Sequence, residues 1–63
     1  MLNKLKEVRE AKGFTVLELA QKSAVTRQTI YNIEKNANAV VSSSVMEALS
    51  KALDAKPSEI FLI

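Results

Sequence analysis

The sequence predicts a compact all-α domain of five helices, and three observations favour this fold class. Apolar residues make up 48% of the 63 residues and recur at helical spacing, as at Leu5 and Val8. A single Gly and a single Pro disfavour a β-sandwich or a disordered segment. Two capping-box matches, at residues 15–18 and 44–47, are typical of helix starts. We therefore expect one domain over residues 1–63, near the lower size limit for independent folding.

The first two helices are expected at residues 4–12 and 16–23. Asn3 can cap the first helix, and Gly13 can end it in the left-handed conformation that a residue without a Cβ adopts freely. Thr15 can accept a hydrogen bond from the backbone three residues later, so it is the expected cap of the second helix.

The third helix, expected at residues 27–35, has one apolar side and one unusual polar side. Thr26 can cap it, and Ile30 and Ile33 anchor it to the core. Its outward side carries Arg27, Gln28, Tyr31 and Asn32 in place of the Glu and Lys of an ordinary solvated helix. Arg can pair bidentately with guanine, and Gln or Asn with adenine. Such a face is equipped to read the major groove of DNA.

Two further helices are expected after a Ser-rich stretch. Ser44 is the expected cap of the fourth helix, which continues to Leu53 with Met46 on its core side. Residues 56–61 predict a final short helix with Pro57 at its first helical position.

Two short capped helices joined by about three residues match the spacing of a helix-turn-helix. With this helix-turn-helix spacing, the sequence resembles the lambda-repressor/Cro-like, or XRE-type, family over residues 5–61. The resemblance is carried by residues 5–9, 12–15, 18–20, 25–27, 29–30 and 33–34. It implies a compact five-helix lambda-repressor-like domain in which the second and third helices form the helix-turn-helix.

The chain departs from the family pattern at several positions. Val16 stands where the family usually has a Gln that contacts phosphate. Ala24 replaces the usual turn Gly, which is tolerable if its φ is not positive. Asn36 stands where a Gly usually ends the third helix, and Asn is the next-best left-handed residue. The loop over residues 37–42 is unusually apolar and one residue longer.

The resemblance implies roles for particular residues. Arg27, Gln28, Tyr31 and Asn32 are expected to read DNA bases, although Arg27 could hold a phosphate instead. The phosphate candidates are Thr15, Thr26, Thr29, Lys35, Asn36 and Asn38. The family's pairing positions also predict a bidentate ion pair between Arg9 and Glu34. The alternative for that pair is two separate surface charges.

Composition disfavours most other classes of function. There is no Cys and no His, so the chain lacks thiolate metal ligands and the commonest general base. We therefore expect no enzyme, metal, cofactor or small-molecule ligand. The charged start is neither a signal peptide nor a membrane anchor, which favours a bacterial or phage-encoded cytoplasmic protein. Residues 1–36 hold seven basic against four acidic side chains, and residues 37–63 two against three. This asymmetry arises by chance or because the first half faces phosphate.

The expected function is that of a transcriptional regulator, a repressor that binds double-stranded DNA at a palindromic operator as a homodimer. Val40, Val41, Leu62 and Ile63 are the apolar residues outside the expected helices, so they are the candidates for the dimer interface. Alternatively, Val40 or Val41 folds back under the fourth helix. Two other functions fit the same fold: an antitoxin that regulates its own toxin pair, and a protein-interaction scaffold without DNA binding.

Overall fold

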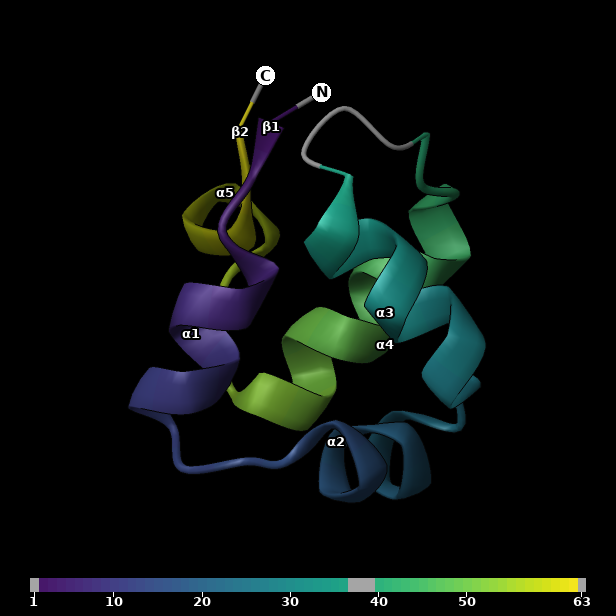
Figure 1. Cartoon of the computed structure of the whole chain (residues 1–63). Helices are drawn as coiled ribbons and strands as arrows, with labels where there is room; N and C mark the ends of the chain where they lie inside the picture. Colours follow the sequence, from purple (N-terminus) through teal and green to yellow (C-terminus); the bar gives the residue numbers. More distant parts are fainter. Residues whose placement is uncertain (1, 37–39, 63) are drawn as a thin grey trace.

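Five helices and one short pair of strands make up the described part of the chain, residues 2–36 and 40–62 of a computed structural model (Figure 1). The elements follow in the order β1 (Leu2–Asn3), α1 (Leu5–Ala11), α2 (Val16–Ser23), α3 (Arg27–Lys35), α4 (Ser43–Leu53), α5 (Pro57–Ile60) and β2 (Phe61–Leu62). The all-α prediction is confirmed, and the strand pair is an addition that the sequence did not predict. None of the described helices is long and apolar enough to cross a membrane.

Local capping explains why α2 and α3 begin where the sequence predicted. The Glu18 N–H donates to Thr15 Oγ1 at 3.1 Å, and the Thr15 N–H donates to Glu18 Oε1 at 2.9 Å, which completes the capping box. At the start of α3, the Thr29 N–H donates to Thr26 Oγ1 at 3.3 Å. Both helices have the predicted bounds.

Asn3 links the start of α1 to the end of α3. Its Oδ1 accepts a hydrogen bond from the Leu5 N–H at 3.2 Å, and its Nδ2 donates to the Ile33 carbonyl at 3.1 Å. The helix spans Leu5–Ala11, one residue shorter at each end than predicted. The expectation that Asn3 caps α1 was wrong, because Lys4 occupies the N-cap position and provides no side-chain cap. The Asn3 amide instead joins the first residue of α1 to the end of α3.

The predicted cap of α4 was wrong. Ser42, not Ser44, accepts the hydrogen bond from the Val45 N–H, at 3.3 Å, and the helix begins at Ser43. The earlier start places Val41 just before the cap and Met46 four residues after it, the spacing of a hydrophobic staple. Val41 is buried in the core and Met46 packs against it. Burial of these apolar side chains therefore selects among three serines that are locally equivalent.

The core draws on every helix. The fully buried large side chains are Leu5 from α1, Leu19 from α2, Ile30 from α3, Leu49 and Leu53 from α4, and Ile60 from α5. Figure 1 shows α4 lying behind α3, with the two chain ends together at the opposite end of the molecule from α2. Because α3 contributes to this core through its apolar side, its orientation is fixed and its polar side faces outward.

The strand pair gives Leu62, one of the candidates for the dimer interface, a backbone partner within the chain. β1 and β2 pair antiparallel, with Leu2 opposite Leu62 and Asn3 opposite Phe61. The Lys4 N–H extends this contact by donating to the Ile60 carbonyl at 2.6 Å. The two ends of the described chain are therefore hydrogen-bonded to each other.

The turn between α2 and α3 carries backbone strain. Ala24 has φ +62°, so the condition under which Ala was expected to be tolerable does not hold. A non-Gly residue in this region costs about 1–2 kcal/mol. Ser23 supports the turn, because its Oγ donates to the Leu19 carbonyl at 2.7 Å and accepts from the Val25 N–H at 3.2 Å.

The two other turn expectations have opposite outcomes. Gly13 is left-handed with φ +79°, as predicted. Asn36 has φ −120° and ψ 101°, so the expectation of a left-handed residue after α3 was wrong. The Asn36 N–H is already satisfied by the Asn32 carbonyl at 3.1 Å, and the chain leaves α3 in an extended conformation. No left-handed cap is therefore required at this end.

Candidate nucleic-acid interface

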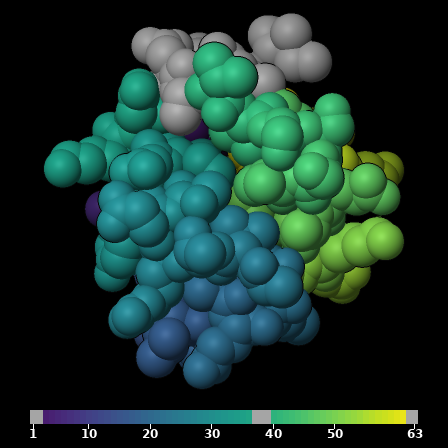
Figure 2. Space-filling model, turned by 90° about the vertical axis from the view of Figure 1, so that its right-hand side faces the viewer, coloured from purple at the N-terminus to yellow at the C-terminus, as the bar shows by residue number. Residues whose placement is uncertain are grey.

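The exposed side of α3 holds all four predicted base-reading side chains. Arg27, Gln28, Tyr31 and Asn32 are all exposed, and Tyr31 retains 55% of its accessible surface. Arg27 and Tyr31 are four residues apart, as are Gln28 and Asn32, and residues four apart lie on the same face of a helix. Figure 2 shows α3 in teal at the surface, next to α2 in blue and α4 in green. We name the surface formed by these four side chains the reading face.

The two amides of the reading face contact each other. Gln28 Nε2 donates to Asn32 Oδ1 at 3.3 Å. Because each amide carries one acceptor oxygen and two donor hydrogens, Gln28 Oε1 and the Asn32 NH₂ group keep hydrogen-bonding capacity for another molecule. The contact places a donor and an acceptor next to each other, the pattern that the major-groove edge of adenine requires.

Two hollows border the reading face. One lies at the start of α3 and is lined by Thr26, Arg27, Gln28 and Tyr31. The other, which we name the α1–α3 hollow, is lined by Lys6, Arg9, Val16, Gln28, Tyr31, Glu34 and Lys35. Gln28 and Tyr31 border both, so they separate one hollow from the other.

Arg9 and Glu34 form the predicted bidentate fork beneath this surface. Arg9 Nε donates to Glu34 Oε2 at 2.7 Å and Arg9 Nη2 donates to Glu34 Oε1 at 3.1 Å. Arg9 Nη1 also donates to the Phe14 carbonyl at 2.7 Å. Hydrogen bonding to Glu34 raises the pKa of Arg9. The pair therefore joins α1, the loop before α2 and the end of α3.

Burial of this fork also removes a negative charge from the interface. The Arg9 and Glu34 side chains are only 10% and 8% exposed. The Glu34 carboxylate is directed inward and neutralised by the guanidinium. It therefore contributes little repulsion toward an anion that approaches α3 from outside.

The phosphate candidates at the helix starts differ in their surroundings. Thr26 and Thr29 share a 2.9 Å hydrogen bond between their hydroxyl groups at the N-terminus of α3, where the helix dipole favours an anion. Thr15 lies beside Glu18, whose pKa is lowered by hydrogen bonds from Thr15. The ionised Glu18 makes Thr15 the least favourable of the three for a phosphate.

The candidates at the other end of α3 are exposed. Lys35 and Asn36 are both accessible, and Asn38 lies outside the described residues. Val16, which occupies the family's phosphate-contacting position, is 8% exposed and belongs to the core. That contact is therefore replaced by core packing in this chain.

Lys6 was not among the predicted site residues. It is exposed on α1 and lines the α1–α3 hollow together with Lys35. A signal was present in the sequence, because Lys6 stands three residues before Arg9 and Lys35 directly follows Glu34. The predicted Arg9–Glu34 pair therefore indicated that α1 and α3 meet near both lysines, but not on which side of the contact each lysine lies.

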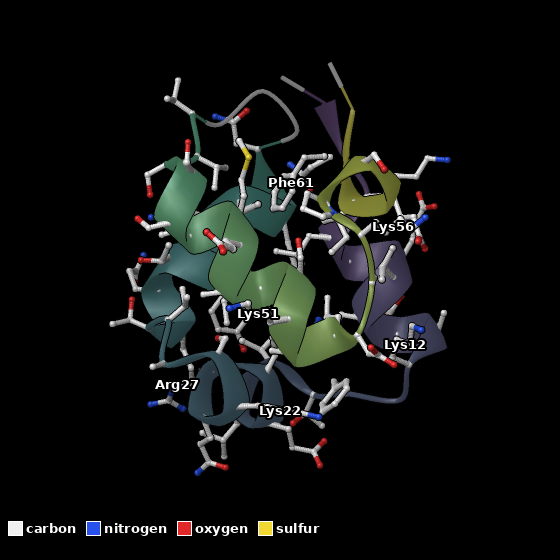
Figure 3. All side chains as sticks on the ribbon, turned by 180° about the vertical axis from the view of Figure 1, so that it is seen from behind. Lys12, Lys22, Arg27, Lys51, Lys56 and Phe61 are labelled. Carbon is white, nitrogen blue, oxygen red and sulfur yellow. The ribbon has the colours of Figure 1, made fainter. Side chains whose placement is uncertain are left out.

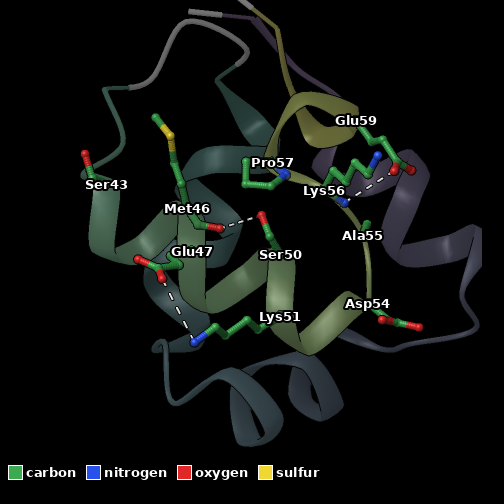
Figure 4. Close-up of a pocket in the computed structure, with 10 residues that line it drawn as sticks. All are labelled: Ser43, Met46, Glu47, Ser50, Lys51, Asp54, Ala55, Lys56, Pro57 and Glu59. Atoms are coloured by element: carbon green, nitrogen blue, oxygen red, sulfur yellow. Dashed lines mark hydrogen bonds and ion pairs between the residues drawn. The ribbon is translucent and has the colours of Figure 1, made fainter.

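A third hollow, between α4 and α5, has a different character (Figure 4). Its charged lining mixes Glu47, Asp54 and Glu59 with Lys51 and Lys56. Figure 3 shows Lys56 and Arg27 on opposite sides of the molecule. This mixed-charge surface contains none of the predicted site residues, so it provides a reference surface for experiments on the reading face.

The four candidates for the dimer interface are separated by the structure. Val40 is 98% exposed, whereas Val41 is 8% exposed and lies in the core, so the alternative in which one of the two valines folds back holds for Val41. The Leu62 backbone pairs with Leu2, and Ile63 lies outside the described residues. Of the two candidates whose side chains the structure describes, Val40 is accessible and Val41 is not.

Comparison with known proteins agrees with this geometry. A family model described as helix-turn-helix matches residues 5–60. Among solved structures, the restriction-modification controller protein C.AhdI from Aeromonas hydrophila is similar to this chain, with 34% sequence identity and a TM-score of 0.79. The similarity covers 87% of this chain and 82% of that chain. No curated protein matches the chain.

Proposed function

We propose that this chain, a DNA-binding transcriptional regulator of the lambda-repressor/Cro-like (XRE-type) helix-turn-helix family, is a repressor. In this proposal it binds a palindromic operator as a homodimer. The observation that carries the proposal is the reading face. Buried Ile30 and Ile33 fix one side of α3, and hydrogen-bonding side chains occupy the other. A helix of this kind fits the major groove of B-DNA, where each base pair presents a distinct pattern.

Within this proposal the side chains of the reading face have distinct roles. Gln28 and Asn32 contact adenine through paired hydrogen bonds, and Arg27 contacts guanine or the phosphate at the start of α3. Tyr31 reaches a thymine methyl group or the backbone. The Gln28–Asn32 hydrogen bond supports a combined role for the two amides, because it orients each side chain relative to the other.

Phosphate contacts set the register of α3 without reading sequence. Thr26 and Thr29 are the proposed contacts at its start, supported by the helix dipole. Lys35 and Asn36 are the proposed contacts at its end. Phosphates bound at both ends would keep α3 aligned with the groove.

A dimer follows from the size of the module. One helix of nine residues reads few base pairs, so selective binding requires a second copy. The Cα extents of one copy are 25 × 21 × 19 Å. Two copies side by side are compatible with half-sites about 34 Å, or about 10 base pairs, apart.

Selection of bound sequences from random duplex DNA tests the function. We expect the chain to enrich a two-fold symmetric site with half-site centres about 10 base pairs apart, or a multiple of that spacing. Enrichment of a single asymmetric half-site would contradict the dimer. Failure to enrich any sequence would contradict the regulator and favour the scaffold function.

The dimer interface is tested at Val40. Figure 1 places the residues directly before α4 and the strands β1 and β2 at the same end of the molecule, so a partner bound there could cover them together. Val40→Ser should weaken self-association, because burying a Val side chain contributes roughly 1.5–3 kcal/mol. Sedimentation at micromolar concentration would measure the change.

Leu17→Ser is the matched control, because Leu17 is 49% exposed on α2 at the opposite end of the molecule. If Leu17→Ser shifts the sedimentation and Val40→Ser does not, the interface lies at α2.

A further inference from the structure

We propose that Lys6 of α1 and Lys35 of α3 together bind one phosphate of the DNA backbone beside the reading face. Both lysines are exposed and line the α1–α3 hollow. This inference rests on the proposed function and adds to it a positioning residue outside the helix-turn-helix. It makes α1, which otherwise only supports α3, part of the DNA-binding surface.

The charge in the hollow favours an anion. Glu34 is the one acidic residue that lines it, and its carboxylate is engaged by Arg9 and 8% exposed. Glu10 lies one turn beyond Lys6 on α1, and the described residues contain no ion pair between them. Two ammonium groups therefore face solvent without a neutralising partner in the hollow. Lysine binds phosphate as a flexible point charge, so exact bidentate geometry is not required.

The position of the hollow matches where a phosphate would lie. Gln28 and Tyr31 border both this hollow and the one at the start of α3. When the base edges of a duplex lie against Gln28, the phosphate backbones of the duplex pass along the two borders of the reading face, where the two hollows lie. Thr26 and Thr29 lie at the start of α3, and Lys6 and Lys35 lie in the hollow on the other side of Gln28 and Tyr31. The two sets of contacts can therefore hold the two strands that flank the major groove.

Binding measured over a range of salt concentrations tests this inference. Lys6→Gln combined with Lys35→Gln should reduce the slope of log affinity against log salt by about 0.9, the contribution of one phosphate, and Lys6→Gln alone should reduce it by part of that amount. Between about 50 and 200 mM salt, the affinity of the double variant should fall about threefold less than that of the original chain. The loss should be equal for the selected duplex and for an unrelated duplex, because a phosphate contact carries no sequence information. Lys35→Gln should behave in the same way.

Two further variants separate charge from structure. Lys6→Arg keeps the positive charge and should retain the original slope. Lys56→Gln removes an exposed lysine from the hollow between α4 and α5, and it should leave both the salt slope and the affinity for DNA unchanged. An original slope in Lys6→Gln, or a loss confined to the selected duplex, would overturn the inference while leaving the proposed function intact. An original chain that binds no duplex would overturn the proposed function and this inference together.

Discussion

Replacing Arg9 with Ala is expected to lower the free energy of unfolding by about 3–5 kcal/mol, because the change leaves the buried Glu34 carboxylate without its partner. The Glu34 side chain is 8% exposed and accepts two hydrogen bonds from Arg9. The Phe14 carbonyl would lose its donor as well. A domain of this size has roughly 3–9 kcal/mol of stability, so the variant would be close to unfolding.

A double-mutant cycle in urea measures the coupling. Arg9→Ala and Glu34→Ala should each be strongly destabilising, and the double variant should lose much less than their sum. The exposed pair of Lys51 and Glu47, with side chains 80% and 69% exposed, is the control and should couple by at most about 0.5 kcal/mol. If the single variants do not fold, the combination of Arg9→Met with Glu34→Leu should still fold, since apolar replacement of a buried pair is often neutral. Additive losses would show that the fork contributes nothing as a pair.

Gln28→Ala is expected to cost about 1–3 kcal/mol of binding to the selected site and to relax the preference at one base step. The amide is exposed at the centre of the reading face and borders both hollows. Its removal also ends the contact with Asn32, so the preference of the neighbouring step should weaken less strongly. The effect on unrelated DNA should be small, because the side chain does not contact phosphate in this arrangement.

The comparison that isolates this role uses two duplexes and one matched residue. Affinities of Gln28→Ala for the selected and an unrelated duplex would be measured at the same salt concentration. Gln21→Ala removes an exposed amide from α2 that lines neither hollow at α3, so its affinities should stay close to those of the original chain. Equal weakening of both duplexes by Gln28→Ala would make Gln28 a backbone contact instead of a base reader.

The elements that could be predicted are those specified by short-range signals. Thr15 and Thr26 each bond to a backbone amide three residues later, so the caps alone determined the starts of α2 and α3. The start of α4 could not be predicted in this way. Three consecutive serines offer the same local chemistry, and burial of Val41 against distant parts of the chain selects Ser42.

The site shows the same division between local and distant information. The reading face was predictable because helical periodicity places Arg27, Gln28, Tyr31 and Asn32 opposite the buried isoleucines. The contribution of Lys6 depends on how α1 lies against α3, which the Asn3 and Arg9 contacts determine. The pairing of Leu62 with Leu2 joins residues sixty positions apart and has no local signal.

The most direct test of the account maps the DNA-binding surface by NMR, with the selected duplex added to the labelled chain. We expect the largest chemical-shift changes on the side-chain amides of Gln28 and Asn32 and on the backbone amides of α3. Smaller changes should occur at Lys6, and residues around Lys56 in the α4–α5 hollow should not shift. Changes concentrated in that hollow, with α3 unaffected, would contradict the claim that the exposed side of α3 reads DNA.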